Sequence, residues 1–305
     1  MGPTGDAIHP HLPPAEVEVD AALVRRLLAT QHPDLADREL AFVGEGWDNA
    51  MFRVGSDLVV RIPRRAAAAE LVLHEARALA PLAPRLPLPI PTPVRTGTPG
   101  EGYPWAWNVV PWFEGEEAAL ASPPDADAER FVDFLIALHT EAPADAPDNA
   151  VRGVPLVEHA EGVERGFAQL RKETGIVTPA IEAGWADALA APVATTAVWL
   201  HGDLHGRNAL LRNGHFAAII DWGDVTSGDA ACDLAALWML FEDPDIRAEA
   251  LDRYGADPAL RRRALGSAIR FATVLLAHGR KGDPRLASIG ANTFRRVETD
   301  LALAR

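Results

Sequence analysis

The stretch VWLHGDLHGRNALL at residues 198–211 is followed almost directly by FAAIIDWGD at residues 216–224. In both stretches, a short apolar run typical of a strand leads into polar residues. Asp203 and Asn208 follow the first run, and Asp221 ends the second. We therefore expect a hairpin of these two runs to bring two carboxylates and one carboxamide close together.

This group of polar side chains has the chemistry of a magnesium site. Mg²⁺ prefers oxygen ligands and is commonly held by one or two such groups together with substrate phosphates. A further carboxylate can accept the proton of an attacking hydroxyl group. The combination suits phosphoryl transfer, in which the protein supplies positioning and charge. A hairpin whose Asp and Asn side chains are merely solvated is the alternative, and the spacing disfavours it.

HGDLHGRN followed by IIDWGD closely resembles the catalytic segments of the aminoglycoside phosphotransferase family, which has a protein-kinase-like fold. The resemblance extends from about residue 19 to the C-terminal helices and is strongest at residues 200–235. It implies that Asp203 is the catalytic base or orients the acceptor hydroxyl. It also implies that Asn208 and Asp221 hold the Mg²⁺ that bridges the phosphates of ATP, with GTP as a possible substitute.

Four neighbouring residues have less certain roles. The resemblance makes His201 structural and makes Asp233 the anchor of the catalytic loop, although Asp233 could simply complement a helix dipole. Arg207 could contact a phosphate or form a surface salt bridge. His205 is expected to fill loop structure.

The segment VGEGWDNAMFRVG at residues 43–55 occupies the place of the hairpin that covers the nucleotide in the family. Gly44 and Gly46 allow a tight turn whose backbone N–H groups can approach phosphates. The resemblance therefore makes Gly46 a candidate nucleotide-binding residue, with an ordinary β-turn as the alternative. The chain contains no G-x-x-x-x-G-K-[ST] motif.

Arg61, in LVVRIPRR at residues 58–65, stands where a kinase has the lysine that holds the α- and β-phosphates. Arginine keeps a permanent charge and can bind phosphate through two N–H groups, so the role can survive this change. The resemblance pairs Arg61 with Glu75 on the following helix, and Glu70 is the rival partner. An exposed ion pair is the alternative for Glu75.

The segment NVVPWFEG at residues 108–115 matches the hinge between the two lobes of the family. The resemblance implies that adenine stacks on apolar side chains and bonds backbone groups here, so Val110, Trp112 and Phe113 are candidate nucleotide-binding residues. Pro111 has no N–H group, and the donor is therefore expected at Trp112 or Phe113. A core strand that ends in a turn is the alternative.

The predicted fold class is α+β, a protein-kinase-like bilobal fold. Apolar periodicity predicts a helix at residues 19–33 with Asp20 as its N-cap, then an antiparallel meander of three strands at residues 39–63. A helix at residues 66–80 is expected to end at Pro81. The expected parts are a flexible tail (1–18), an N-lobe with a β-sheet (19–112) and a mainly helical C-lobe with the catalytic loop and acceptor site (113–305), whose later helices are expected at 229–242, 258–278 and 290–304.

Composition limits the possible partners and locations. With 305 residues, 48% of them hydrophobic, the chain can bury the core of two lobes. A net charge of −14 argues against nucleic acid as a partner. No signal peptide or membrane span is read, and the one cysteine, Cys232, excludes an internal disulfide, so a cytoplasmic location is expected. Oligomeric state stays open.

Members of the family phosphorylate hydroxyl groups of aminoglycosides, macrolides, homoserine, choline and other small molecules. Because HGDLHGRN is nearer the aminoglycoside form, an aminoglycoside-type antibiotic is the leading expectation. Antibiotic resistance is the role that such an acceptor would imply, and a metabolic role stays open. Such a cationic acceptor needs an acidic pocket, for which Asp224, Glu242, Asp243 and Asp245 are candidates. A loop that ends a helix is the stronger interpretation of FEDPD at residues 241–245.

The predicted activity is that of a phosphotransferase with an alcohol group as acceptor. A kinase of another small molecule is the second possibility. A non-catalytic binding protein with the kinase fold is disfavoured because Asp203, Asn208 and Asp221 are all present. A protein kinase is disfavoured because no D-F-G or A-P-E motif lies between Asp221 and Asp233.

Overall fold

The computed structural model describes residues 13–121 and 123–303, so most of the predicted tail at residues 1–18 lies outside the described residues. The chain divides into two compact units. The first contains the described part of Met1–Leu73 together with Pro93–Trp112, and the second contains His74–Thr92 and Phe113–Arg305. No helix among the described residues is both long and apolar enough to cross a membrane.

The first unit is built on an antiparallel five-stranded sheet in the order β1-β2-β3-β5-β4. The predicted meander of three strands is confirmed, and two further strands extend it. The strands are β1 (Leu40–Glu45), β2 (Asn49–Val54), β3 (Leu58–Pro63), β4 (Arg95–Gly97) and β5 (Trp107–Pro111).

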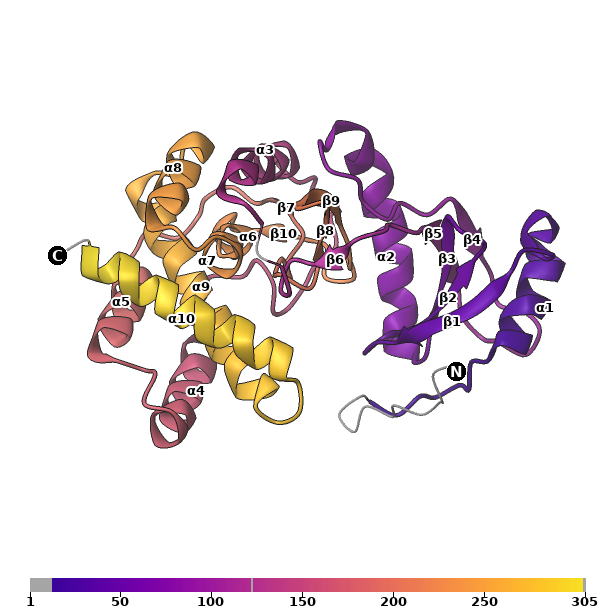
Figure 1. Ribbon diagram of the computed structural model, residues 1–305, viewed down its shortest axis with the longest axis horizontal. Coiled ribbons are helices and arrows are strands. Elements are labelled where there is room, and N and C mark those ends of the chain that lie inside the picture. Colours follow the sequence, from indigo (N-terminus) through magenta and orange to yellow (C-terminus); the bar gives the residue numbers. More distant parts are fainter. Residues whose placement is uncertain (1–12, 122, 304–305) are drawn as a thin grey trace. The chain divides into compact units, whose positions relative to one another are not determined.

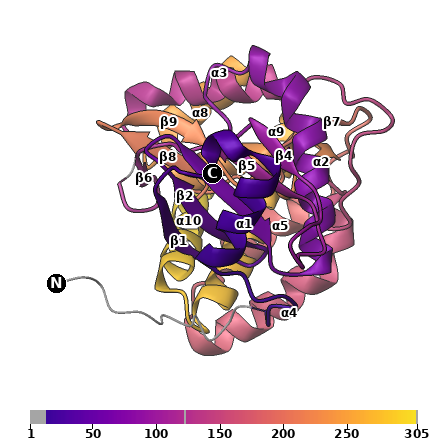
Figure 2. The same ribbon diagram turned by 90° about the vertical axis from the view of Figure 1, so that its right-hand side faces the viewer.

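Helix α1 (Ala21–Gln31) covers one face of this sheet (Figures 1 and 2). It begins where the sequence predicts, because the Asp20 side chain accepts a hydrogen bond of 2.7 Å from the N–H of Leu23. Leu27 on the helix and Phe52 and Val60 on the strands belong to one buried apolar cluster. This burial fixes the helix against the sheet.

Helix α2 (Ala66–Leu82) continues past its predicted end and contains Pro81. A proline in the last turn removes only one backbone hydrogen bond, so the helix can continue to Leu82 before a 3₁₀ turn at Ala83–Arg85.

The second unit is mainly helical. Its helices are α3 (Ala128–Leu138), α4 (Ala160–Glu173), α5 (Pro179–Leu189), α6 (Ala231–Leu234), α7 (Ala236–Leu240), α8 (Pro244–Tyr254), α9 (Pro258–Gly279) and α10 (Pro284–Leu303). Helix α9 is the most buried of the long helices and lies beside α10 (Figure 1). Helix α10 begins six residues before its predicted start.

Five short strands of this unit frame the motif at residues 198–224: β6 (Glu116–Glu117), β7 (Val198–Leu200), β8 (Ala209–Arg212), β9 (His215–Ile219) and β10 (Thr226–Gly228). The expectation that the runs at 198–200 and 216–219 form one hairpin is wrong. β7 pairs with β10, whereas β9 pairs with β8.

The β8–β9 hairpin turns at Asn213 and Gly214, whose φ angles are 54° and 81°. Positive φ at both central residues is the geometry that an Asn-Gly pair favours in a two-residue hairpin. The loop at residues 201–208 therefore runs from β7 to β8, and residues 220–225 run from β9 to β10.

Candidate active site

The start of the loop at residues 201–208 is anchored by one buried carboxylate. Asp233 on α6 is fully buried and accepts hydrogen bonds from the backbone N–H groups of His201 (2.7 Å) and Gly202 (2.9 Å). These two N–H groups follow directly after the last residue of β7, where strand pairing has ended. The geometry therefore gives Asp233 the anchoring role that the resemblance implied.

Two further side chains hold Asp233 in place. His139 Nε2 lies 3.3 Å from its Oδ2 atom, and Tyr254 Oη lies 2.8 Å from His139 Nδ1. Burial raises the pKa of Tyr254, so its O–H group stays protonated and can donate to His139 Nδ1. Burial also acts to raise the pKa of Asp233, but the hydrogen bond and charge of His139 outweigh it and keep this pKa below its usual range.

His201 connects the loop to the segment that carries Asp221. Its Nε2 atom donates to the carbonyl oxygen of Ile220 (2.9 Å), and its Nδ1 atom accepts from the N–H of Asp203 (3.2 Å). The ring also lies 4.7 Å from the ring of Trp222, centroid to centroid. Because both ring nitrogens are engaged with the backbone, His201 has a structural role.

Asn208 lies at the end of the same loop and faces Asp203. Its Nδ2 atom donates to the backbone oxygen of Asp203 (2.9 Å), and its own backbone oxygen accepts from the N–H of Ile220 (2.8 Å). The carboxamide is thereby oriented so that its Oδ1 atom makes no hydrogen bond within the described part of the chain. Oδ1 is the atom that could bind a metal ion.

Asp221 is exposed and has a φ of 62°, in the left-handed region. Aspartate tolerates this conformation better than most residues, and such backbone strain often marks functional positions. Ile220, the residue before Asp221, contacts both His201 and Asn208, so the backbone next to Asp221 lies beside the loop at residues 201–208. The predicted hairpin does not produce this proximity, since β7 pairs with β10 and β9 with β8.

Asn208 and Asp221 can supply only some of the ligands of a Mg²⁺ ion. Over residues 13–121 and 123–303, no group of three or more His, Cys, Asp or Glu side chains is arranged to hold a metal ion by itself. One carboxylate and one carboxamide match a magnesium ion that takes its remaining ligands from water and substrate phosphates.

The carboxylate of Asp203 has two charged or polar neighbours. Arg152 Nη2 lies 2.7 Å from Oδ1, and His205 Nε2 lies 3.6 Å from Oδ2. Burial acts to raise the pKa of Asp203, but the charges of His205 and Arg152 outweigh it and hold this pKa below its usual range. Asp203 is therefore ionised at neutral pH and can accept a hydrogen bond from a hydroxyl group.

Sequence reasoning missed Arg152 and Asn149, although it named their partner Asp224. The Nε atom of Arg152 also lies 3.2 Å from Asp224 Oδ2, and Asn149 Nδ2 donates to the other oxygen of Asp224 at 2.8 Å. No motif surrounds residues 149–152, and only the tertiary fold brings this loop to Asp203.

Most of the acidic residues expected to line a pocket for a cation have other partners. Glu242 forms ion pairs with Arg295 and Arg296, and the hydrogen bond from Arg295 does most to lower its pKa to about 2. Asp243 caps α8 by accepting from the N–H of Asp245 (2.8 Å). The interpretation of this segment as a loop between helices is thus confirmed, with the addition that Asp243 and Pro244 begin α8, a helix that the sequence analysis missed.

Arg207 forms a salt bridge. Its Nη1 atom donates to Asp283 Oδ2 at 2.9 Å, and its Nε atom lies 3.9 Å from Glu117 Oε2. Of the two roles predicted for Arg207, the structure favours the ion pair.

The candidate nucleotide residues of the first unit lie on and beside its sheet. Arg61 is buried on β3, opposite Asn108 of β5, and Val110 of β5 is buried opposite Val59. The N–H of Gly46 donates to the carbonyl oxygen of Asn49 at 2.9 Å, which closes the turn between β1 and β2.

The remaining candidates are Trp112, which directly follows β5, and Phe113 and Glu75, which both belong to the second unit. The N–H of Trp112 donates to the carbonyl oxygen of Asp57 at 2.8 Å, so the protein itself uses this donor. Phe113 begins the next segment of the second unit. Glu75 lies on α2 and is 2% exposed, which excludes the interpretation as an exposed ion pair.

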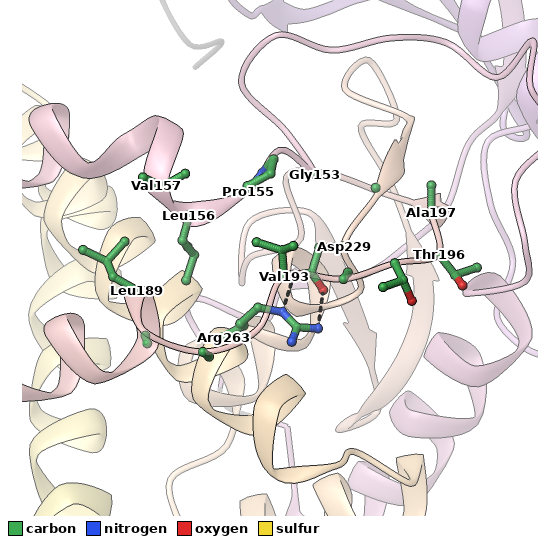
Figure 3. Close-up of a pocket in the computed structure, with 15 residues that line it drawn as sticks. Gly153, Pro155, Leu156, Val157, Leu189, Val193, Thr196, Ala197, Asp229 and Arg263 are labelled. Atoms are coloured by element: carbon green, nitrogen blue, oxygen red, sulfur yellow. Dashed lines mark hydrogen bonds and ion pairs between the residues drawn. The ribbon is translucent and has the colours of Figure 1, made fainter.

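A cavity of about 230 Å³ opens elsewhere in the second unit (Figure 3). It is lined largely by apolar side chains, among them Leu156, Leu189 and Val193, and its polar wall is the ion pair of Arg263 with Asp229 (2.6 Å). None of Asp203, Asn208 and Asp221 lines it. We therefore do not place the chemistry in this cavity.

We expect Gly202→Ala to disturb the catalytic loop. Gly202 has a φ of 85°, and an added Cβ would lie 2.5 Å from the backbone oxygen of Asp224. The strain should lower the free energy of unfolding by about 1–3 kcal/mol. Urea denaturation measures this loss. Gly162→Ala on α4, where an added Cβ meets nothing within 4 Å, is the matched control and should not destabilise. Equal stability of the two variants would contradict the expectation.

Comparisons with known proteins show the family of this chain and support its fold. The model of the phosphotransferase enzyme family matches residues 39–265. No curated protein gives a significant match. The GDP complex of wild-type aminoglycoside 2′-phosphotransferase-IIIa is similar in structure, with a TM-score of 0.64 and 20% identity over 94% of this chain and 100% of that one.

Two macrolide-modifying enzymes are similar to a comparable degree. Macrolide 2′-phosphotransferase type I has a TM-score of 0.60 and 24% identity, covering 91% of this chain and 97% of that one. The apoenzyme of a macrolide 2′-phosphotransferase from Brachybacterium faecium has a TM-score of 0.60 and 22% identity, covering 88% and 96%. At these identities the solved structures support the kinase-like fold, and the family model covers most of the sequence. The chain belongs to the phosphotransferase enzyme family.

Proposed function

We propose that this protein transfers the terminal phosphoryl group of ATP, or of GTP, to a hydroxyl group of a small molecule. The observation that carries the proposal is the loop anchored by Asp233, on which Asn208 bonds the backbone oxygen of Asp203 and also contacts Ile220, the residue before Asp221. Nucleotide use is supported by solved relatives that contain GDP, ATP or ADP.

In the proposed reaction, the acceptor oxygen attacks the terminal phosphorus, and the bond from that phosphorus to the bridging oxygen breaks. Asp203 orients the hydroxyl group and takes its proton, and the nucleoside diphosphate leaves with the bridging oxygen. Asn208 and Asp221 would hold Mg²⁺, which when bound neutralises charge on the phosphate oxygens. Positioning of the reactants by these fixed side chains supplies much of the rate.

We assign nucleotide binding to residues outside the catalytic loop as well. Arg61 binds phosphate oxygens, with Glu75 as the residue that orients it, and Gly46 lets the backbone of its turn approach the phosphates. Val110 supplies apolar contact for the base. Because the Trp112 N–H already bonds Asp57, Phe113 is the better candidate for the backbone donor to the base, and Trp112 contributes through its side chain.

The acceptor is a small hydroxyl compound, and aminoglycoside-type antibiotics are the first class to test. Relatives of similar fold contain kanamycin or gentamicin in their structures, and others are macrolide phosphotransferases. The engagement of Glu242 and Asp243 by other residues weakens the case for a strongly cationic acceptor. Macrolides, choline, homoserine and sugars therefore belong in the same panel.

The test is phosphate transfer from ATP with Mg²⁺ to this panel, with the phosphorylated product identified by mass spectrometry. Asp221→Asn removes one of the two metal-binding groups and should abolish magnesium-dependent transfer while preserving the fold. Phosphate transfer that the wild-type protein catalyses and Asp221→Asn does not supports the proposal. Failure of the wild-type protein to bind any nucleotide would reject it in favour of a non-catalytic protein with the same fold.

A further inference from the structure

The guanidinium group of Arg270 on α9 carries a charge that lacks an ionic partner. Arg270 is 6% exposed, and its Nη2 atom donates to the backbone oxygen of Val151 at 3.0 Å. Among the described residues, no carboxylate oxygen lies within 4 Å of this guanidinium group, and its Nε and Nη1 atoms make no hydrogen bond. Burial of a charge without a paired counter-charge is costly, so such an arrangement is rarely retained without a function.

Arg270 lies close to the catalytic carboxylate. The residue that accepts its hydrogen bond, Val151, directly precedes Arg152, which contacts Asp203 at 2.7 Å. The guanidinium carbons of both arginines lie near the ring of Phe271, at 5.4 Å for Arg152 and 4.9 Å for Arg270. Both arginines therefore lie in the region of Asp203, where Arg152 is paired with Asp203 and Asp224 and Arg270 has no carboxylate partner of its own in the described part of the chain.

A small cavity of about 10 Å³ lies beside Arg270, and several of the side chains that line it can donate hydrogen bonds. Arg270, Ser267 and His159 line it, together with Cys232 and Asp229. Asp229 is already paired with Arg263 at 2.6 Å, and burial raises the pKa of the Cys232 thiol to about 12, so the thiol carries no charge. The lining therefore presents N–H and O–H donors and a positive charge, in a space that fits about one oxygen atom.

We propose that the acceptor carries an anionic group, a carboxylate or a phosphate, and that one oxygen of this group enters the small cavity and binds Arg270. Arg152, which contacts Asp203, and Arg270 both lie near the ring of Phe271, so the anionic group and the hydroxyl that is phosphorylated would bind in one region. The inference rests on the proposed function of the same site. It argues against a polycationic antibiotic as the acceptor. The contacts of Glu242 and Asp243 with other residues of the protein argue against it as well.

Three six-carbon polyols that differ in one terminal group test the charge preference: gluconate carries a carboxylate, glucitol a hydroxyl and glucamine an ammonium group. Isothermal titration calorimetry gives their dissociation constants for the full chain. We expect gluconate to bind at least about tenfold more tightly than the other two, because charge-assisted hydrogen bonds are the stronger kind. Glucitol 6-phosphate distinguishes a phosphate site from a carboxylate site.

Arg270→Gln should remove the preference for the anion, and Arg270→Lys should keep part of it. Because the charge at Arg270 is uncompensated, the Gln variant should fold, which circular dichroism checks. Arg253→Gln is the matched control, since Arg253 is exposed and already paired with Asp133. Equal binding of the three polyols, tighter binding of glucamine, absence of binding by all three, or an anion preference that survives in Arg270→Gln would overturn the inference.

The two proposals can fail separately. Transfer of phosphate to a cationic aminoglycoside, without any preference for gluconate, leaves the kinase function intact and rejects the anionic subsite. A preference for gluconate that depends on Arg270, in a protein that binds no nucleotide, leaves the subsite intact and rejects the kinase function.

Discussion

Asp203→Asn should lower the rate of phosphate transfer by about 10²–10⁴-fold, the usual contribution of a positioned general base. The amide has the same shape as the carboxylate but cannot take the proton of the acceptor hydroxyl. Nucleotide affinity should stay close to the wild-type value, because the proposed metal-binding atoms of Asn208 and Asp221 are unchanged. Initial rates and calorimetric nucleotide titration measure the two effects.

The fold should tolerate this substitution. Arg152 loses the charge of Asp203 but keeps its contact with Asp224 at 3.2 Å. Asp187→Asn is the control, since Asp187 is an exposed residue of α5 whose ion-pair partner is Arg262 and not a residue of the loop. A variant at 203 that retains the wild-type rate would show that Asp203 is not the base.

Asp233→Ala should be the most destabilising substitution in the catalytic region. It leaves the N–H groups of His201 and Gly202 and the Nε2–H group of His139 without their acceptor in a fully buried place. Removing one partner from a buried charged network typically lowers the free energy of unfolding by about 3–5 kcal/mol. Because the loop is released at its start, phosphate transfer should fall as well.

Urea denaturation of the wild type, Asp233→Ala and Asp233→Asn measures how much the Asp233 side chain contributes to the free energy of unfolding. The Asn variant keeps one acceptor oxygen and should lose about 1–3 kcal/mol, so the three proteins should form a series. Asp252→Ala, which removes an exposed ion pair with Arg261, should change stability by about 0–1 kcal/mol. If Asp233→Ala were no less stable than Asp252→Ala, the anchoring role would have to be abandoned.

Local sequence signals predicted the elements that depend on local chemistry. Asp20 caps α1 because its side chain needs only a neighbouring N–H group, and the meander of β1 to β3 follows from alternation and short turns. The short spacing of Asp203 and Asn208 predicted that they share one loop, and the structure joins them by a hydrogen bond. The same kind of signal at Asn213 and Gly214 and at Asp243 and Pro244 could have predicted the β8–β9 hairpin and α8.

Other features depend on contacts between distant segments. The pairing of β7 with β10 joins two strands of three residues each, which are too short to show which partner they will take. Arg152 reaches Asp203 from a loop that precedes it by about fifty residues and contains no recognised motif. Arg270 is one of several buried arginines, and what distinguishes it is that, over the residues the structure describes, no ion pair with a carboxylate accompanies its burial, which the sequence does not reveal.

The position of Cys232 allows its thiol to report on the opening of the catalytic loop. It is the one cysteine in the sequence, it is buried on α6, and its Sγ atom donates to the backbone oxygen of Gly202 at 3.6 Å. A thiol reagent can modify it only when α6 and the loop separate, so the modification rate of the native protein follows the opening equilibrium of this region. Acceptors and nucleotides that tighten the loop can therefore be ranked by how far they slow this labelling, without an engineered probe.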